Sequence, residues 1–148
     1  MGAINGVSAR PLRIIPTEGG PVLHMLRADD PEFTAFGEVY CSEVEPGAIK
    51  AWKRHTLMTQ HFIVPVGRIL FALYDDRPDS PTRGEVQECV LGRPDAYGLL
   101  TIPPMLWYGF KGLAAHPSLI VNCADLAHQA NESERADVTA RFIPYSWK

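Results

Sequence analysis

The chain has 148 residues, enough for one domain with a substantial core and too few for two, so we expect a single domain over 1–148. Hydrophobic residues make up 46% and charged residues 21%, a balance typical of globular rather than disordered chains. The net charge of −3 and the lack of Lys/Arg blocks argue against a nucleic-acid partner. Because no signal-like segment and no membrane-length apolar run is present, we expect no membrane partner and a cytoplasmic location.

Short apolar or alternating segments, separated by Pro- and Gly-containing turns, run along the whole chain. A hydrophobic period of two over a few residues predicts β-strands. In chain order, the predicted strands cover residues 21–26, 37–44, 48–53, 59–66, 68–75, 84–91, 97–102 and 118–123. Short strands at regular spacing are typical of an antiparallel sandwich or barrel.

Helical signals are weak by comparison. The segment DDPEFTAF (29–36) is compatible with one short helix or turn that begins at an Asp cap, and little else has a helical period. The sequence therefore predicts an all-β fold, with a jelly-roll β-barrel as the leading form and one or two short helical turns.

Two apolar strands flank a turn at Gly67 and Arg68, in the segment VPVGRILFALYDDR. The second strand ends at a loop that carries Asp75, Asp76 and Arg77. Residues at such a loop can face the mouth of a barrel. Arg77 either contacts a substrate there or forms a loop ion pair that fixes the turn.

The spacing of the first cupin motif, G-x5-H-x-H-x4-E-x6-G, is matched by Gly47, Lys53, His55, Gln60 and Gly67. The chain thus resembles a cupin. Metal-binding cupins hold their ion with the two histidines and the glutamate of this motif and one histidine of a second motif, and of these four ligands only His55 is kept. A lysine ammonium and a glutamine amide cannot replace imidazole and carboxylate, because a metal needs lone pairs from several ligands at once. We therefore expect no metal.

More specifically, the chain resembles a short, divergent subgroup of the dTDP-4-dehydrorhamnose 3,5-epimerase-like proteins, the sugar-nucleotide branch of the cupins. The matching segments are DDRPDSPTRGE (75–85), LTIPPMLWYGFKGL (100–113), LIVNCAD (119–125) and IPYSW (143–147). This resemblance implies a cupin-type jelly-roll barrel, a small-molecule nucleotide sugar as ligand, no cofactor and a homodimer.

The resemblance also implies proton transfer next to a ketone. In these epimerases a histidine backed by an aspartate removes a proton beside the 4-keto group of the sugar, and a tyrosine returns one from the other face. The ketone acidifies the neighbouring C–H bond and takes up the negative charge as an enolate. Positioned bases and a cationic environment are therefore sufficient for the reaction.

Several functional positions of the family carry other residues here. The family's R-G-L-H segment aligns with residues 50–53, which puts Lys53 at the base position, while Lys50 keeps a positive charge suited to a sugar or phosphate contact. The tyrosine position falls on Asn122, and a further histidine position falls on Tyr108.

The candidate catalytic residues are His55, Lys53 and Tyr108. His55 is either the acid/base group or a hydrogen-bonded pocket histidine without chemistry. Lys53 can act as a base if burial and neighbouring cations lower its pKa; otherwise it binds an anion or is exposed. Tyr108 either supplies a proton or only lines the barrel.

The candidate substrate-binding residues are Lys50, Gln60, Asn122 and Arg77. Lys50 suits an anion, and the amides of Gln60 and Asn122 can hydrogen-bond a ketone or hydroxyl group. His61 follows Gln60 on the same predicted strand, so we expect their side chains to face opposite sides of the sheet.

The resemblance and the residues together predict a metal-independent sugar-nucleotide epimerase or isomerase in deoxysugar or surface-polysaccharide biosynthesis. Its substrate would be a dTDP-4-keto-6-deoxyhexose, with His55 or Lys53 as the base and Tyr108 as the proton donor. Two alternatives stay open. The first is a cupin that binds a sugar nucleotide but has lost the epimerase base and acid; the second is a metal-dependent cupin enzyme, which the ligand count argues against.

Overall fold

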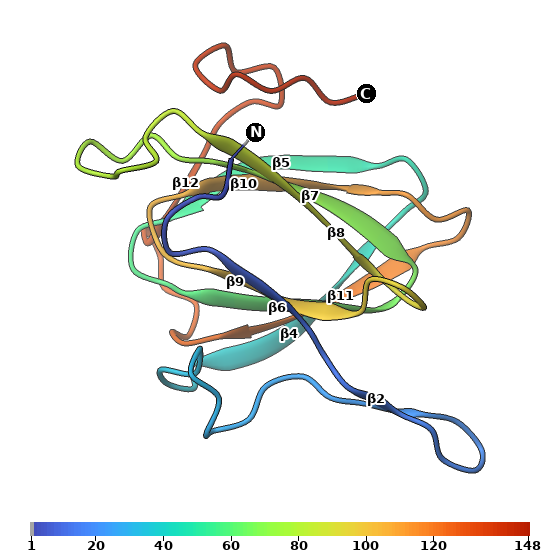
Figure 1. The fold of residues 1–148 in the computed structure, drawn as a ribbon. Helices are drawn as coiled ribbons and strands as arrows, with labels where there is room; N and C mark the ends of the chain where they lie inside the picture. Colours follow the sequence, from blue (N-terminus) through green and yellow to red (C-terminus); the bar gives the residue numbers. More distant parts are fainter. Residues whose placement is uncertain (1) are drawn as a thin grey trace.

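A computed structural model describes residues 2–148, and two five-stranded antiparallel sheets face each other in it (Figure 1). The first sheet has, in spatial order, β1 (Ser8–Pro11), β9 (Gly98–Ile102), β6 (Gln60–Val66), β11 (Ser118–Ala124) and β4 (Glu38–Val44). The second has β12 (Ser133–Arg135), β5 (Ile49–His55), β10 (Trp107–Gly112), β7 (Arg68–Tyr74) and β8 (Val86–Gly92). A separate two-stranded sheet pairs β2 (Ile14–Ile15) with β3 (Val22–Leu23). The all-β prediction is confirmed.

The eight predicted strands correspond to β3 through β9 and β11, whereas β1, β2, β10 and β12 were not predicted. The expected helical turn is wrong: residues 28–32 form turns, residues 33–36 have no regular structure, and no helix occurs between residues 2 and 148. The Asp30 side chain accepts a hydrogen bond from the backbone N–H of Arg27 at 2.8 Å, which favours a local turn over a continuing helix.

The turn at Gly67 does not form a hairpin, because β6 lies in the first sheet and β7 in the second. Gly67 has a φ of 86°, and a Cβ atom at this position would collide with the Oγ atom of Ser118. Only glycine combines this backbone conformation with such a close approach. The chain therefore passes directly from one sheet to the other at this residue.

The main hydrophobic core lies between the two sheets. The rings of Phe62 on β6 and Phe71 on β7 are 5.3 Å apart, so the sheets are in direct contact through their inner faces. The core also contains Val44, Val64, Leu100, Ile102 and Ile120 from the first sheet and Ile69, Leu73 and Leu91 from the second. Alternating inward residues on both sheets explain the strand signals in the sequence.

The two ends of the chain cover the outer faces of the sandwich. Residues near the N-terminus, including Leu12 and Met25, pack on the outer face of the first sheet against Leu99. Ile143 and the aromatic residues after it pack on Trp52 at the outer face of the second sheet, where the C-terminal segment is visible above β5 and β7 in Figure 1. Both terminal segments thus shield apolar surface.

Over residues 2–148 the strand pairings give separate sheets rather than one closed, hydrogen-bonded barrel. β4 forms one edge of the first sheet, and β12 beside β5 forms an edge of the second. No helix long and apolar enough to cross a membrane occurs in the described part of the chain.

Candidate active site

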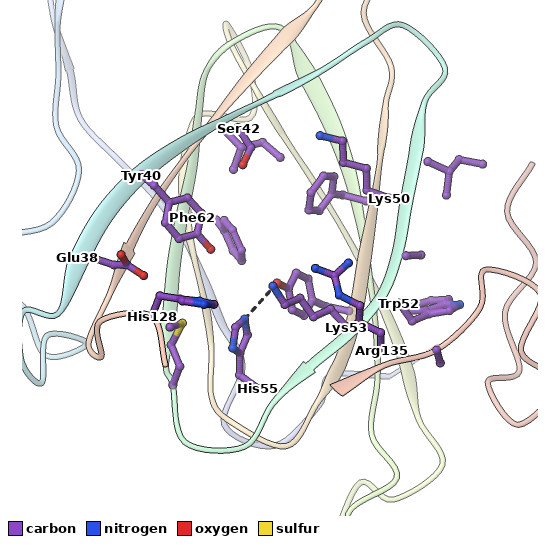
Figure 2. Close-up of a pocket in the computed structure, with 17 residues that line it drawn as sticks. Glu38, Tyr40, Ser42, Lys50, Trp52, Lys53, His55, Phe62, His128 and Arg135 are labelled. Carbon is purple, nitrogen blue, oxygen red and sulfur yellow. Dashed lines mark hydrogen bonds between the residues drawn. The ribbon is translucent and has the colours of Figure 1, made fainter. Parts of the chain in front are cut away.

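A cavity of about 690 Å³ lies between the inner faces of the two sheets, where β4 approaches β5 and β12. We call the side chains from the second sheet the β5 wall: Lys50, Lys53, His55, Tyr108 and Arg135. We call those from the first sheet the β4 wall: Glu38, Tyr40 and Ser42. Figure 2 shows Tyr40 reaching into the cavity from β4 and Lys50, Lys53 and His55 from the other side. The apolar lining includes Met58, Phe62, Phe110 and Ile120.

His55, the last residue of β5, is paired with a carboxylate. Its side chain is buried, and its Nδ1 atom lies 2.6 Å from Oε1 of Glu132. A carboxylate only accepts hydrogen bonds, so Nδ1 carries the hydrogen and donates it. Burial lowers the pKa of His55, although the hydrogen bond to Glu132 acts in the opposite direction. The neutral imidazole therefore presents the lone pair of Nε2 to the cavity.

Glu132 lies directly before β12 and is held by several donors. Its Oε2 atom accepts hydrogen bonds from the backbone N–H groups of Leu57 and Met58, each at 3.0 Å. Burial alone would raise the pKa of Glu132, but the hydrogen bonds from His55 and from these two N–H groups outweigh burial and lower it. Glu132 is therefore a fixed carboxylate that orients the His55 ring and selects its tautomer.

Tyr108 lies on β10 beside His55. Its hydroxyl oxygen is 3.4 Å from Nε2 of His55, and the two rings are stacked with 17° between their planes. Burial raises the pKa of the Tyr108 hydroxyl well above its usual range. The hydroxyl therefore keeps its proton and donates towards Nε2, from the same wall of the cavity as His55.

Lys53 and Arg135 occupy directly paired positions on β5 and β12. Burial and the charge of Arg135 lower the pKa of Lys53, an effect that Glu132 offsets in part. Like charges opposite one another destabilise a sheet, and a bound anion would relieve this repulsion. Lys50 adds a third cation to the β5 wall; its Nζ atom donates to the backbone carbonyl of Glu43 at 2.9 Å, which leaves two N–H donors for a ligand.

Gln60 and Asn122 lie beneath the cavity surface rather than on it, with exposed fractions of 1% and 0%. The Nδ2 atom of Asn122 donates to the Tyr40 hydroxyl at 3.0 Å and to Oε1 of Gln60 at 3.3 Å. The backbone N–H of His61 donates to Oδ1 of Asn122 at 3.1 Å. The two amides therefore reach the cavity through Tyr40 and do not line it themselves.

Arg77 lies outside the cavity lining, in the loop that follows β7. Its Nε and Nη2 atoms each donate to the carboxylate of Asp75 at 2.9 Å, and Ser80 and Thr82 also donate to that carboxylate. Burial opposes the charged form of Asp75, but these hydrogen bonds dominate and hold its pKa well below the usual range. Arg77 thus forms an ion pair that fixes the loop.

Within residues 2–148, no group of three or more His, Cys, Asp and Glu side chains is arranged to hold a metal ion. At the positions where metal-binding cupins carry ligands, this chain has Lys53, His55, Gln60 and Tyr108. The ammonium group of Lys53 offers no lone pair, and Gln60 is hydrogen-bonded beneath the cavity. The residues present do not fit a cupin metal site.

Comparisons with known proteins agree with this architecture, although no family model matches the chain. The dTDP-4-dehydrorhamnose 3,5-epimerase of Bacillus anthracis shares the fold, with 19% identity, a TM-score of 0.84 and coverage of 96% of this chain and 85% of that chain. The structure of a dTDP sugar isomerase from Desulfovibrio desulfuricans is 57% identical, with a TM-score of 0.95 and coverage of 97% and 92%. A probable low-salt glycan biosynthesis epimerase of Haloferax volcanii is 35% identical over 144 residues, which are 96% of this chain and 88% of that relative. The chain belongs to the dTDP-4-dehydrorhamnose 3,5-epimerase-like family.

In this dTDP-4-dehydrorhamnose 3,5-epimerase-like chain, the histidine–carboxylate pair is not where the sequence alignment put the base. The alignment gives Lys53, whereas the structure pairs His55 with Glu132. Lys53 and His55 both lie on β5 and line the cavity. The shift of the histidine by two positions along the strand therefore keeps the imidazole in the cavity.

Sequence reasoning missed Glu132, Tyr40 and Arg135. Tyr40 carried a usable signal, since it lies two residues from both Glu38 and Ser42 and strand alternation puts all three on one face. Glu132 and Arg135 carried no such signal. Glu132 precedes the three-residue strand β12 and Arg135 ends it, and the pairing of β12 with β5 is a property of the fold.

Proposed function

We propose that the protein is a metal-independent sugar-nucleotide epimerase or isomerase that acts on a dTDP-4-keto-6-deoxyhexose in deoxysugar or surface-polysaccharide biosynthesis. The observation that carries this proposal is the buried His55–Glu132 pair at the wall of a cavity large enough for a nucleotide sugar. The names of two relatives, a dTDP sugar isomerase and a glycan biosynthesis epimerase, support the substrate class and the pathway.

His55 is the proposed base. Once substrate displaces the 3.4 Å contact with the Tyr108 hydroxyl, the Nε2 lone pair takes a proton from the carbon next to the ketone. The electrons of that C–H bond pass to the ketone oxygen to give an enolate. The imidazolium that forms keeps its Nδ1 hydrogen bond to the Glu132 carboxylate, at 2.6 Å in the resting structure. This charge pairing stabilises the protonated state only as it develops, which is what catalysis requires.

The cations of the β5 wall have two uses in this proposal. Lys50, Lys53 and Arg135 neutralise the diphosphate of the nucleotide and stabilise the negative charge of the enolate. Lys53 is then an anion-binding group rather than the base. Burial and the charge of Arg135 lower the pKa of its ammonium group, and a bound anion would favour the charged form.

A cupin that only binds a sugar nucleotide is the less favoured reading. That alternative depended on the loss of the family's base, and the His55–Glu132 pair supplies an oriented, neutral imidazole in the cavity. Tyr108 keeps a protonated hydroxyl beside it. An oriented base and a protonated hydroxyl beside it are the groups that proton transfer needs.

Hydrogen exchange tests the proposal. In D2O, the protein should catalyse exchange of the protons on the carbons flanking the ketone of dTDP-4-keto-6-deoxyglucose, followed by proton NMR. Exchange no faster than in buffer, with the nucleotide sugar still bound, would show that the protein is a binding protein for this compound.

The same proposal includes the finer structural expectations: a single cupin domain with jelly-roll connectivity, a homodimer and a cytoplasmic location. The facing sheets support the jelly roll.

Exposed Val39 on the edge strand β4 supports pairing with a second copy, since edge strands need cover. Light scattering of the purified protein tests the dimer.

A further inference from the structure

We propose that Tyr40 is the second proton-transfer group of this site and that it acts on the substrate face opposite His55, which makes the protein an epimerase rather than a same-face isomerase. The inference rests on the proposed function, because it needs a substrate enolate in the cavity. It concerns a residue on a different strand from Asn122, the position to which the sequence alignment assigned the family's tyrosine.

The pairing of β4 with β11 places the Tyr40 hydroxyl in the cavity, whereas the side chain of Asn122 does not reach it. Tyr40 on β4 is directly paired with Asn122 on β11, and its oxygen lies 3.0 Å from Nδ2 of Asn122. The ring lines the cavity, whereas Asn122 is completely buried behind it. A phenol from the neighbouring strand thus stands in front of the asparagine.

The hydrogen-bond network fixes which way the Tyr40 proton points. The backbone N–H of His61 can only donate, so the amide atom of Asn122 that faces it at 3.1 Å is the oxygen. The NH2 group of Asn122 therefore faces Tyr40 and donates to its hydroxyl oxygen. Tyr40 accepts this bond, and its own O–H hydrogen remains available for a ligand in the cavity.

Tyr40 and His55 approach a ligand from opposite walls. Tyr40 belongs to the first sheet, while His55 and Tyr108 belong to the second. Figure 2 shows the Tyr40 ring entering the cavity from β4, across from Lys50 and Lys53 of the β5 wall. Tyr108 cannot serve the far face, because its hydroxyl is 3.4 Å from the base itself. Inversion at carbon needs removal and return of a proton on opposite faces, and the β4 wall holds the hydroxyl that meets this need.

The Tyr40 hydroxyl is protonated at neutral pH, and a hydrogen-bond donor is already in place for its conjugate base. Burial raises the pKa of Tyr40, and the nearby acids Glu38 and Glu132 raise it further, while the hydrogen bond from Asn122 acts in the opposite direction. The donor is therefore ready before reaction. After the proton leaves, the same Asn122 N–H group donates to a phenolate, and such charge-assisted bonds are about twice as strong as neutral ones.

Every proton in the proposed step is accounted for. Nε2 of His55 removes the proton from one face, and the C–H electrons form the enolate. The enolate collapses to the ketone as its carbon takes the Tyr40 proton from the other face, leaving a phenolate and an imidazolium. Tyr40 is 37% exposed, so solvent at the cavity mouth reprotonates it, and His55 returns its proton to solvent.

The test separates exchange from inversion. Wild type and Tyr40→Phe are incubated with dTDP-4-keto-6-deoxyglucose in D2O, and NMR follows both deuterium uptake beside the ketone and the configuration of the labelled carbon. We expect Tyr40→Phe to retain exchange through His55 while formation of the inverted product falls about 100-fold or more. Tyr97→Phe is the matched control, because Tyr97 is also on the first sheet side but donates to the backbone carbonyl of His24 outside the cavity; it should leave both rates unchanged.

The outcomes distinguish this inference from the proposed function. No exchange by wild type overturns the proposed function and, with it, the role of Tyr40. Exchange by wild type with no inverted product, or full inversion by Tyr40→Phe, overturns the role of Tyr40 alone.

Asn122→Asp provides a second variant that keeps the phenol. Its carboxylate still accepts from His61 but no longer donates to Tyr40, so it opposes the phenolate. We expect loss of inversion with exchange retained, and a higher pKa for Tyr40 in an ultraviolet titration. Unchanged inversion in this variant would contradict the role given to Tyr40.

Discussion

The two walls of the cavity are built from different chemistry. The β5 wall carries three cations, a neutral imidazole and a phenol that touches it, and its imidazole is oriented by the Glu132 carboxylate. The β4 wall carries one phenol, one carboxylate and one hydroxyl, and its Tyr40 is oriented by a neutral amide. A carboxylate partner favours gaining a proton, and an amide N–H partner favours losing one. Each wall thus suits one half of a proton transfer.

Replacing the imidazole should have the largest effect. We expect His55→Asn to reduce exchange beside the ketone about 1,000-fold, because it removes the base while leaving the cations that bind the nucleotide. His128→Asn is the control, since His128 also lines the cavity but is exposed. Calorimetry with dTDP should give similar affinities for both variants. If exchange survives in His55→Asn, another group of the β5 wall must be the base.

Removing the charge behind the imidazole should have the next largest effect. Glu132→Gln keeps the shape but turns an NH2 group towards either His55 or the N–H groups of Leu57 and Met58. We expect about a 100-fold loss of kcat and a loss of about 1–3 kcal/mol in the free energy of unfolding. A denaturant titration measures the second quantity. The pKa seen in kcat/KM should fall, because the carboxylate raises the pKa of His55.

Neutralising the cations should weaken binding more than chemistry. We expect Lys53→Met to raise the Kd for dTDP about tenfold and to reduce its salt dependence, because one phosphate contact is lost. Lys111→Met is the control on β10, where the lysine is not part of the cavity lining. A fall in kcat much larger than the change in Kd would instead assign Lys53 to the chemical step.

The pH dependence should distinguish the groups of the β5 wall. Burial lowers the pKa of His55, so kcat/KM should rise with pH below about 6.5 and be flat at neutral pH. A further rise at alkaline pH would indicate Lys53 as the base.

The free energy of unfolding should also increase with pH in the acidic range. The folded pKa values of His55 and Glu132 are both lowered, so the unfolded state binds more protons. The free energy of unfolding is therefore highest above about pH 6.5 and falls as the pH decreases through the folded pKa values. Thermal melts in a pH series would measure this fall, and a melting temperature that rose on acidification would contradict it.

The smallest effect on activity should come from outside both walls. We expect Arg77→Ala to leave exchange unchanged, because Arg77 does not line the cavity, and to lower the free energy of unfolding by about 1–3 kcal/mol by unpairing the buried Asp75. A rise in the Kd for dTDP would show that this loop reaches the nucleotide after all.

The sequence predicted the strands best where an apolar run was nearly continuous, as in β6 and β7. It missed β10, because the prolines before it and the small residues Gly109 and Gly112 hide the pattern. Motif spacing predicts Gln60 in the pocket, and the resemblance to the epimerases predicts Asn122 there. Neither can tell a residue that lines the cavity from one buried beneath its surface.

The carboxylate partner of the base could not be predicted for a related reason. Glu132 lies 77 positions from His55, in a segment without apolar periodicity. Its contact depends on β12 adding to the edge of β5, and on the turn after β5 presenting two N–H groups. Both are properties of the assembled sandwich.

The late position of Glu132 has a consequence for synthesis of the protein. Every strand of the two sheets except β12 precedes Glu132 in the chain, so all the wall residues except Arg135 are synthesised before the carboxylate that orients His55. A nascent chain can therefore hold a nearly complete cavity with an unoriented imidazole. The hydrogen bond between His55 and Glu132 forms only after Glu132 has emerged.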